Sequence, residues 1–131
     1  MGMNYLLDTN TVIYYLQQQF SPAASAFVDK MLITSQPCLS VITEIELLCW
    51  KTASQNDIKI IQNFINDSIV IELESSIKYI TVDIRKIHKI KLPDAIIAAT
   101  ALDRNLTLIT RNVSDFKGIS GLKLINPWLL V

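Results

Sequence analysis

Residues 4–16 of the chain read NYLLDTNTVIYYL. The first four residues form a short apolar run that ends at Asp8, and the residues that follow place Val12 and Leu16 on one face of a helix. This stretch therefore predicts a buried strand that leads, through an aspartate, directly into a helix over residues 9–18.

The same order of short apolar strand and amphipathic helix continues along the chain. Strands are predicted at residues 4–7, 38–40, 69–72, 106–110 and 122–125, and helices at residues 9–18, 22–33, 43–51, 54–67, 76–90 and 94–104. Nearly continuous apolar strands that alternate with helices are typical of an α/β fold with a parallel sheet and helices on both faces. Because the chain holds only 3 glycines and 4 prolines and shows no linker, we expect one domain over residues 1–131.

The composition indicates a compact domain without a bias toward either charge. The 131 residues are 50% apolar and 18% charged, with 12 Lys and Arg against 12 Asp and Glu. This balance argues against a broadly basic surface for nucleic acid, although it leaves room for a local basic strip. A chain of this length buries enough surface to be stable without disulfides or a structural metal.

The cysteines and the apolar runs bear on the location of the protein. Cys38 and Cys49 form no C-x-x-C pair, which favours free thiols in a reducing cytosol over a redox motif or a zinc cluster. The most apolar run, residues 95–102, is far shorter than the roughly 18–20 residues of a membrane-spanning helix. Because the first residues also lack the pattern of a secretory signal, we expect a cytoplasmic protein without a membrane partner.

Four acidic residues lie where predicted strands end or predicted helices begin, namely Asp8, Glu46, Asp94 and Asp115. Each also has a local alternative: a helix cap for Asp8 and Asp94, a capping box with Thr43 for Glu46, and a turn for Asp115. In a parallel sheet covered on both faces, however, functional sites lie outside the carboxyl ends of the strands. The joint placement of the four acids predicts that they meet at this edge.

A cluster of carboxylates implies a cation. Carboxylates a few Å apart repel one another and raise one another's pKa unless a positive charge neutralises them. Mg²⁺ and Mn²⁺ prefer such oxygen ligands and keep water positions open for a phosphate. Ala98 and Ala101 follow Asp94 at helical spacing and would let this helix approach the sheet near Asp8, although ordinary helix packing explains these alanines equally well.

The chain resembles the PIN domain superfamily and, within it, the VapC-type toxins of bacterial and archaeal toxin–antitoxin pairs. Four segments carry the resemblance: LLDTNTVIYYL, LSVITEIELL, LPDAIIAATAL and TLITRNVSDF. In this order they extend from about residue 4 to residue 128. The resemblance implies a parallel five-stranded sheet and a Mg²⁺- or Mn²⁺-dependent ribonuclease. It also implies a homodimer that a cognate antitoxin inhibits.

The resemblance also implies a role for particular residues. The first family acid corresponds to Asp8, the T-x-x-E-L pattern selects Glu46 over Glu44, and the third acid corresponds to Asp94. The fourth position is open between Asn112, two residues after a threonine, and Asp115, just before a phenylalanine. We favour the second of these. The remaining polar residues that would support the metal ligands are Asn10, Thr110 and Asn112.

A basic strip precedes the third acid. It consists of Arg85, Lys86, His88, Lys89 and Lys91, and Arg111 lies near the fourth position. Charge runs are usually solvated helix faces, but a ribonuclease must also hold phosphates beside its carboxylates. We therefore predict RNA contacts from the lysines and arginines of this set. The histidine has no catalytic partner by spacing and is interpreted as part of the strip.

Aromatic and apolar residues near the two ends of the chain suggest contacts within or between subunits. Tyr14, Tyr15, Leu16 and Phe20 are predicted to contribute to a dimer or antitoxin surface. Trp50 and Trp128 are predicted to complete the core or an interface.

Three functions are compatible with these residues. The first is a metal-dependent endoribonuclease in which Asp8, Glu46, Asp94 and Asp115 bind the ion that activates a water. The second is a non-catalytic PIN-like module that binds RNA or protein, which the amide of Asn112 in an acidic position would suit. The third is a phosphotransferase with Asp8 as nucleophile, although Asn10 stands where the dehalogenase pattern requires a second aspartate.

Overall fold

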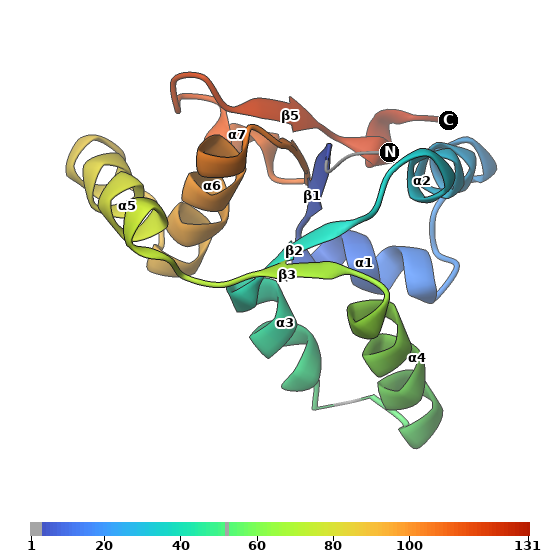
Figure 1. The fold of residues 1–131 in the computed structure, drawn as a ribbon. Coiled ribbons are helices and arrows are strands. Elements are labelled where there is room, and N and C mark those ends of the chain that lie inside the picture. The colour runs from blue at the N-terminus through green and yellow to red at the C-terminus, as the bar shows by residue number, and fades with distance from the viewer. Residues whose placement is uncertain (1–3, 52) are drawn as a thin grey trace.

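The computed structural model describes residues 4–51 and 53–131 and builds them around one parallel sheet (Figure 1). Residues 1–3 of the predicted domain lie outside the described residues. The strands are β1 (Tyr5–Leu7), β2 (Cys38–Ser40), β3 (Ile69–Ile71), β4 (Thr107–Ile109) and β5 (Lys123–Ile125). Their order is β3-β2-β1-β4-β5, and every neighbouring pair is parallel. The predicted α/β fold is therefore confirmed.

Side chains along each strand alternate between the two faces of the sheet, as the pleat requires. Leu6 of β1 pairs with Leu108 of β4, and both belong to the core on one face. The next residues, Leu7 and Ile109, also pair and belong to the core on the other face. All four are fully buried. The sheet is therefore buried on both sides, which explains why its strands are continuous apolar runs.

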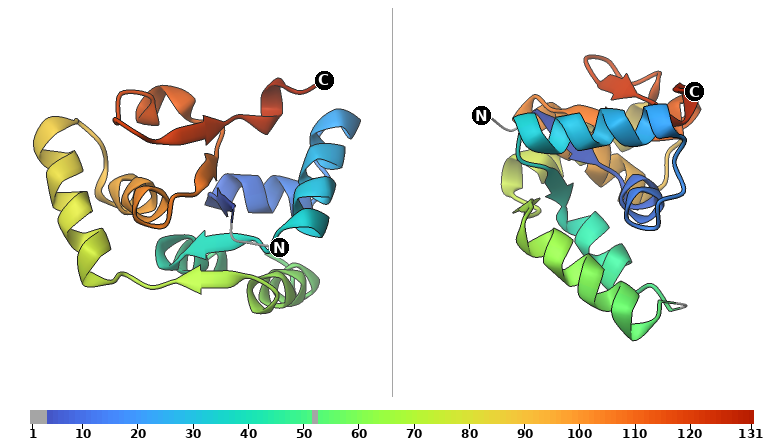
Figure 2. Two further views of the ribbon diagram at one scale, coloured as in Figure 1. Left: turned by 45° about the horizontal axis from the view of Figure 1, so that its top comes forward. Right: turned by 90° about the vertical axis from the view of Figure 1, so that its right-hand side faces the viewer.

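Helices cover both faces of this sheet (Figure 2). The core on one face receives side chains from α5 (Ser75–Ile87), α6 (Leu92–Arg104) and the short α7 (Val113–Phe116). The core on the other face receives them from α1 (Thr9–Leu16), α2 (Pro22–Thr34), α3 (Val41–Leu48) and α4 (Gln55–Asn66). Within residues 4–51 and 53–131, every helix is too short or too polar to span a lipid bilayer.

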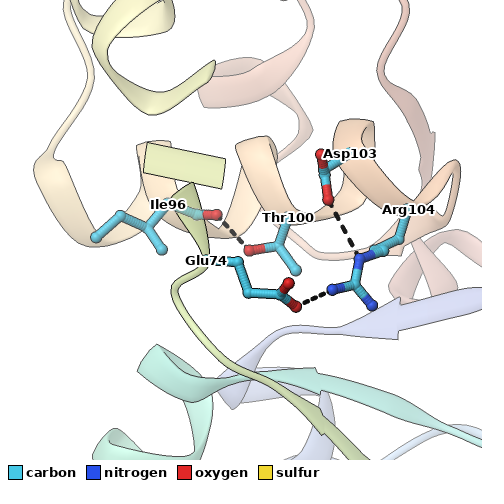
Figure 3. A network of polar contacts seen from close by, with 5 residues as sticks. All are labelled: Glu74, Ile96, Thr100, Asp103 and Arg104. Atoms are coloured by element: carbon cyan, nitrogen blue, oxygen red, sulfur yellow. Dashed lines mark hydrogen bonds and ion pairs between the residues drawn. The ribbon is translucent and has the colours of Figure 1, made fainter. Parts of the chain in front are cut away.

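An ion pair joins the end of α6 to the residue before α5, and further polar contacts lie within α6 (Figure 3). Arg104, the last residue of α6, forms an ion pair with Glu74, which precedes α5. The Nε of Arg104 also donates to Asp103 Oδ2 over 3.2 Å, and Thr100 Oγ1 donates to the carbonyl oxygen of Ile96 over 2.7 Å. The ion pair thus holds the end of α6 beside the start of α5. The first turn of α6, which carries Asp94, lies at the opposite end of this helix pair.

The turn after α1 ends the helix two residues earlier than predicted. Helix α1 stops at Leu16 because Gln18 adopts a left-handed conformation with φ 57°. The chain then places Phe20 against Trp128 of the 3₁₀ helix η1 (Pro127–Leu129), with ring centroids 4.6 Å apart. The ring of Tyr14 lies 5.0 Å from the same tryptophan. Trp128 therefore completes packing within the chain, as predicted.

Helix α3 starts two residues before its predicted start. Ser40, the last residue of β2, is its N-cap, and its hydroxyl accepts a hydrogen bond from the Ile42 amide over 3.1 Å. Thr43 is buried inside the first turn. The interpretation of Thr43 and Glu46 as a capping box is therefore wrong. The serine took this role because the strand leads into the helix without a connecting loop.

The connection between α5 and α6 differs most from the sequence-based expectation. Helix α5 ends at Ile87 instead of residue 90, and His88 follows it in an extended conformation. Helix α6 begins at Leu92, with Lys91 as its N-cap residue. The basic strip therefore divides between the last turn of α5 and a loop that leads into α6.

We expect substitution of Ala98 by leucine to destabilise the protein by about 1–3 kcal/mol, because this alanine of α6 is fully buried between helix and sheet and the larger side chain overpacks the core. Urea unfolding measures the change. The matched control is Ala26→Leu at an exposed position of α2, which should shift the free energy of unfolding by less than about 0.5 kcal/mol. Equal effects would show that α6 does not pack closely on the sheet.

Candidate active site

Three of the four predicted acids line one pocket at the carboxyl edge of the sheet. Asp8, Glu46 and Asp94 surround a pocket of about 200 Å³, and the other residues that line it are Thr9, Asn10, Ile97, Asn112 and Phe116. They come from the β1–α1 junction, from α3 and from the start of α6. The parallel strands bring these distant chain positions together, because their carboxyl ends share one edge of the sheet.

Asp8 combines a capping role with a place in the pocket. It is the N-cap residue of α1, and its Oδ1 accepts hydrogen bonds from the Thr11 amide over 2.9 Å and from the Thr11 hydroxyl over 2.6 Å. Only 9% of its surface is exposed. Burial raises the pKa of this carboxyl above its usual value, although the hydrogen bonds from Thr11 and Thr110 oppose that rise. The predicted capping role is thus confirmed, and it orients the carboxylate.

Glu46 reaches the pocket from the exposed side of α3. Its Oε1 accepts a hydrogen bond from the hydroxyl of Thr9, the first residue of α1. The Thr9 hydroxyl also lies 3.5 Å from Thr43 Oγ1. Glu46, and not Glu44, lines the pocket, in agreement with the T-x-x-E-L pattern.

Sequence analysis missed Thr9 and Thr11. Thr11 is fully buried, and its Oγ1 lies 3.0 Å from the Ile109 carbonyl oxygen as well as next to Asp8. The sequence does indicate these residues, because the segment DTNT places threonines one and three residues after the aspartate at the end of the strand. Polar residues at this spacing orient the first acid and, through Thr9, the second one.

Asp94 lies in the first turn of α6 without capping that helix. Lys91 is the N-cap residue and forms no side-chain cap hydrogen bond, while Pro93 follows in the first turn. The interpretation of Asp94 as the cap of its own helix is therefore wrong. Burial raises the pKa of the Asp94 carboxyl, the negative charges of Asp115 and Glu46 raise it further, and the Lys91 ammonium lowers it.

The fourth acidic position is divided between two residues. Asp115 lies within the four-residue α7, instead of in the expected turn, and lines a second pocket of about 240 Å³ together with Asp94. Asn112 lines both pockets. The backbone N–H of Asn112 donates to the Thr110 hydroxyl over 3.1 Å, which places Thr110 beside the site. The third predicted support residue, Asn10, lines the first pocket. Asp115 thus adjoins Asp94 but does not line the pocket of Asp8.

The predicted RNA-binding residues separate into two groups. Lys89 and Lys91 line the second pocket. Arg85 and Lys86 lie in the exposed last turn of α5 and line neither pocket. The guanidinium carbon of Arg111 lies 5.6 Å from the ring centroid of Trp128, so this side chain is held beside the aromatic cluster.

The donor set suits a hard divalent cation in its chemistry. The pocket presents carboxylate oxygens from three elements, and the amides of Asn10 and Asn112 add further oxygens. In the described part of the chain, no three His, Cys, Asp or Glu side chains are already grouped closely enough to ligate a single ion. An ion held here would therefore draw the carboxylates together, and its charge would offset the repulsion that raises the pKa of Asp94.

Comparison with known families matches residues 5–122 to the PIN domain. This chain belongs to the PIN domain family. The match extends from the start of β1 to the residue before β5, and it therefore includes every acid described above. The family resemblance inferred from the four sequence segments is confirmed.

Relatives of this PIN domain include an endonuclease and a chain in a solved toxin–antitoxin complex. The chain is 28% identical to the tRNA(fMet)-specific endonuclease VapC of Salmonella typhimurium (strain LT2), over 96% of this chain and 98% of that protein. It is similar to the toxin–antitoxin complex from Klebsiella pneumoniae, with 31% identity and a TM-score of 0.74. VapBC-1 from nontypeable Haemophilus influenzae gives 28% identity and a TM-score of 0.78. In both structures, the comparison covers 95% of this chain and 98% of the other.

Substitution of Thr11 by valine keeps the shape of the side chain but removes its hydroxyl. We expect a loss of about 1–3 kcal/mol in the free energy of unfolding, because the buried Asp8 carboxylate loses a hydrogen-bond donor. Thr34→Val at an exposed position of α2 is the control and should change stability by less than about 0.5 kcal/mol. Urea unfolding of the three proteins measures both effects, and equal stability of Thr11→Val and wild type would contradict a stabilising role of the Thr11 hydroxyl beside Asp8.

Substitution of Asp94 by asparagine should stabilise the protein at neutral pH. The raised pKa means that the folded state binds the proton more tightly than the unfolded chain, so the wild-type carboxyl lowers stability as pH rises from 3.8 through its folded pKa. The gain should therefore vanish below pH 3.8, where both states are protonated. Unfolding curves of both proteins across this pH range test the prediction, and a gain that persists unchanged below pH 3.8 would contradict it.

Proposed function

We propose that this PIN domain is a Mg²⁺- or Mn²⁺-dependent endoribonuclease and the toxin of a toxin–antitoxin pair. One observation carries the proposal: Asp8, Glu46 and Asp94, from three separate elements, line one pocket at the carboxyl edge of the sheet. The names of the relatives support it, since the Salmonella protein is an endonuclease and the Klebsiella protein is part of a toxin–antitoxin complex.

The carboxylates would hold the ion, and Asp115 would extend the set from the adjoining pocket. A bound Mg²⁺ or Mn²⁺ polarises a phosphate and lowers the pKa of a coordinated water. Thr11 keeps the Oδ1 of Asp8 fixed, and Thr9 holds Glu46 toward the pocket. Ile97 and Phe116 contribute the apolar part of the pocket lining. These residues prepare a negative site that receives a phosphate only together with a cation.

An antitoxin and a second copy of the chain are the protein partners in this proposal. Large apolar side chains exposed on α3 and α5 support such contacts: Ile45, Leu48, Tyr79, Val82 and Ile87. The aromatic residues predicted for this purpose lie elsewhere. Tyr14 and Phe20 are half-buried and pack on Trp128 within the chain.

The remaining residues predicted for contacts are half-buried as well. The Tyr15 hydroxyl donates to Asp29, while Leu16 and Trp50 pack against the core beside α1 and α2. Trp50 thus completes the core, as predicted. A cytoplasmic location belongs to the proposal because the substrate is RNA and because Cys38 and Cys49 are free thiols.

Removal of single carboxylates tests the proposal directly. Asp8→Asn, Glu46→Gln and Asp94→Asn should each lower RNA cleavage on the order of 100-fold or more, because each removes a charged metal ligand worth several kcal/mol in the transition state. Glu44→Gln, on the same helix as Glu46 but outside the pocket, is the matched control and should retain activity. Cleavage of a labelled RNA with Mg²⁺, with Mn²⁺ and with a chelator measures the effect.

Calorimetric titration with Mn²⁺ separates this proposal from its alternatives. Binding to the wild-type chain that is lost in Asp94→Asn supports the metal site. Full cleavage activity in Asp8→Asn or Asp94→Asn would overturn the assignment of the acids. No binding at millimolar Mn²⁺ would favour a non-catalytic module, and a phosphoryl adduct on Asp8 after incubation with a phosphodonor would favour the phosphotransferase.

A further inference from the structure

The two pockets at the carboxyl edge adjoin one another across the start of α6. They share Asp94 and Asn112 in their linings, and we refer to the two adjoining pockets together as the groove. The two ends of this groove differ in charge. Of the described residues that line the Asp8 end, three are carboxylates and none is a lysine or arginine, whereas at the other end Lys89 and Lys91 lie beside Asp94 and Asp115 and balance their charges.

The loop between α5 and α6 places these lysines on one wall of the groove. His88 is the C-cap residue of α5, and its backbone N–H donates to the Ile84 carbonyl oxygen over 2.8 Å. Its ring lies against Gly118, where an added Cβ would stand 3.6 Å from Cε1 and 3.7 Å from Nδ1. Because Gly118 follows α7, this contact holds the lysine loop beside the wall that carries Asn112 and Asp115. The single histidine thus connects the loop to the residues after α7 by packing.

The ammonium groups of both lysines are available to a ligand. Both side chains are exposed, and within residues 4–51 and 53–131 neither forms an ion pair within 4.0 Å of a carboxylate. The other basic residues differ in position. Arg85 and Lys86 lie on the outer turn of α5, and Arg111 is held beside Trp128.

A polynucleotide carries one negative charge on each successive phosphate. Beside three carboxylates a phosphate is repelled unless a cation accompanies it. A phosphate one step along the strand meets less repulsion at the lysine end, because the ammonium groups of Lys89 and Lys91 balance the carboxylates of Asp94 and Asp115 and can bind the phosphate directly. The reacting phosphate and its neighbour therefore meet different net charges at the two ends of the groove.

We infer that Lys89 and Lys91 form a phosphate-binding subsite for the nucleotide next to the scissile phosphate, and that Arg85, Lys86 and Arg111 do not belong to it. The inference rests on the proposed function, because the subsite is defined relative to the phosphate that is cleaved. In this inference the lysines of the loop before α6 bind the RNA backbone, and the carboxylates of the Asp8 pocket serve the cleavage reaction.

The test replaces both lysines in the full chain, as Lys89→Gln with Lys91→Gln. We expect KM for a short single-stranded RNA of mixed sequence to rise roughly tenfold with kcat nearly unchanged. Without divalent ions, fluorescence anisotropy of the same labelled RNA should show weaker binding. The slope of log K against log salt should fall by about 1.4, which corresponds to two lost contacts with single-stranded phosphates.

Two double variants serve as matched controls. Lys30→Gln with Lys59→Gln removes the same charge from α2 and α4, on the other face of the sheet, and should leave KM and the salt slope unchanged. Arg85→Gln with Lys86→Gln removes it from α5 and should have a much smaller effect than the loop variant. A loss in either control as large as that in the loop variant would overturn the subsite, because net charge or the whole strip would then explain binding.

A conservative variant and the wild-type activity complete the test. Lys89→Arg with Lys91→Arg keeps both charges and should retain RNA binding; a loss equal to that of the glutamine variant would contradict an electrostatic subsite. If the wild-type chain cleaves RNA and the glutamine variant keeps its KM, the inference fails and the proposed function stands. If the wild type cleaves no RNA, the proposed function fails, and unchanged RNA binding by the glutamine variant would overturn the subsite separately.

Discussion

The hydrogen bonds between Asp8 and Thr11 join the fold to the candidate active site. One carboxylate oxygen satisfies the first turn of α1, which starts without a loop after the central strand β1. Since β1 lies between β2 and β4, this junction stands at the centre of the carboxyl edge. A charged group is thereby held nearly buried at the position on which α3 and α6 converge. The burial raises its pKa and makes a cation the natural complement.

The rest of the site depends on how the two flanking helices begin. Ser40 caps α3 directly after β2, so that Glu46 projects toward Thr9 of the neighbouring helix. Lys91 precedes α6, and the Glu74–Arg104 ion pair fixes the far end of that helix. Small buried side chains let α6 lie close to the sheet. The pocket is thus a consequence of strand ends, helix starts and close packing, and no long loop is needed to build it.

The site also shows how a chain with no net charge can suit a nucleic acid. Asp8, Glu46 and Asp94 line one pocket, while Lys89 and Lys91 line the adjoining pocket beside Asp115. Arg85 and Lys86 are close to these lysines in sequence, yet they are exposed in the last turn of α5 and line neither pocket. The net charge of the chain does not show how charges are distributed over short distances. A phosphate responds mainly to the charged groups within about one Debye length, so the local distribution decides whether it binds.

The sequence by itself determined the alternation of strands and helices, the parallel sheet and the placement of Asp8, Glu46 and Asp94 at its edge. Apolar periodicity and strand ends are local properties, so they can be read from neighbouring residues. Only the tertiary structure decided that Ser40 caps α3 in place of Thr43, that Asn112 lines both pockets and that Arg111 is held by Trp128. These outcomes depend on contacts between segments that are far apart in the chain. The order of residues alone does not show which of these segments lie close together in space.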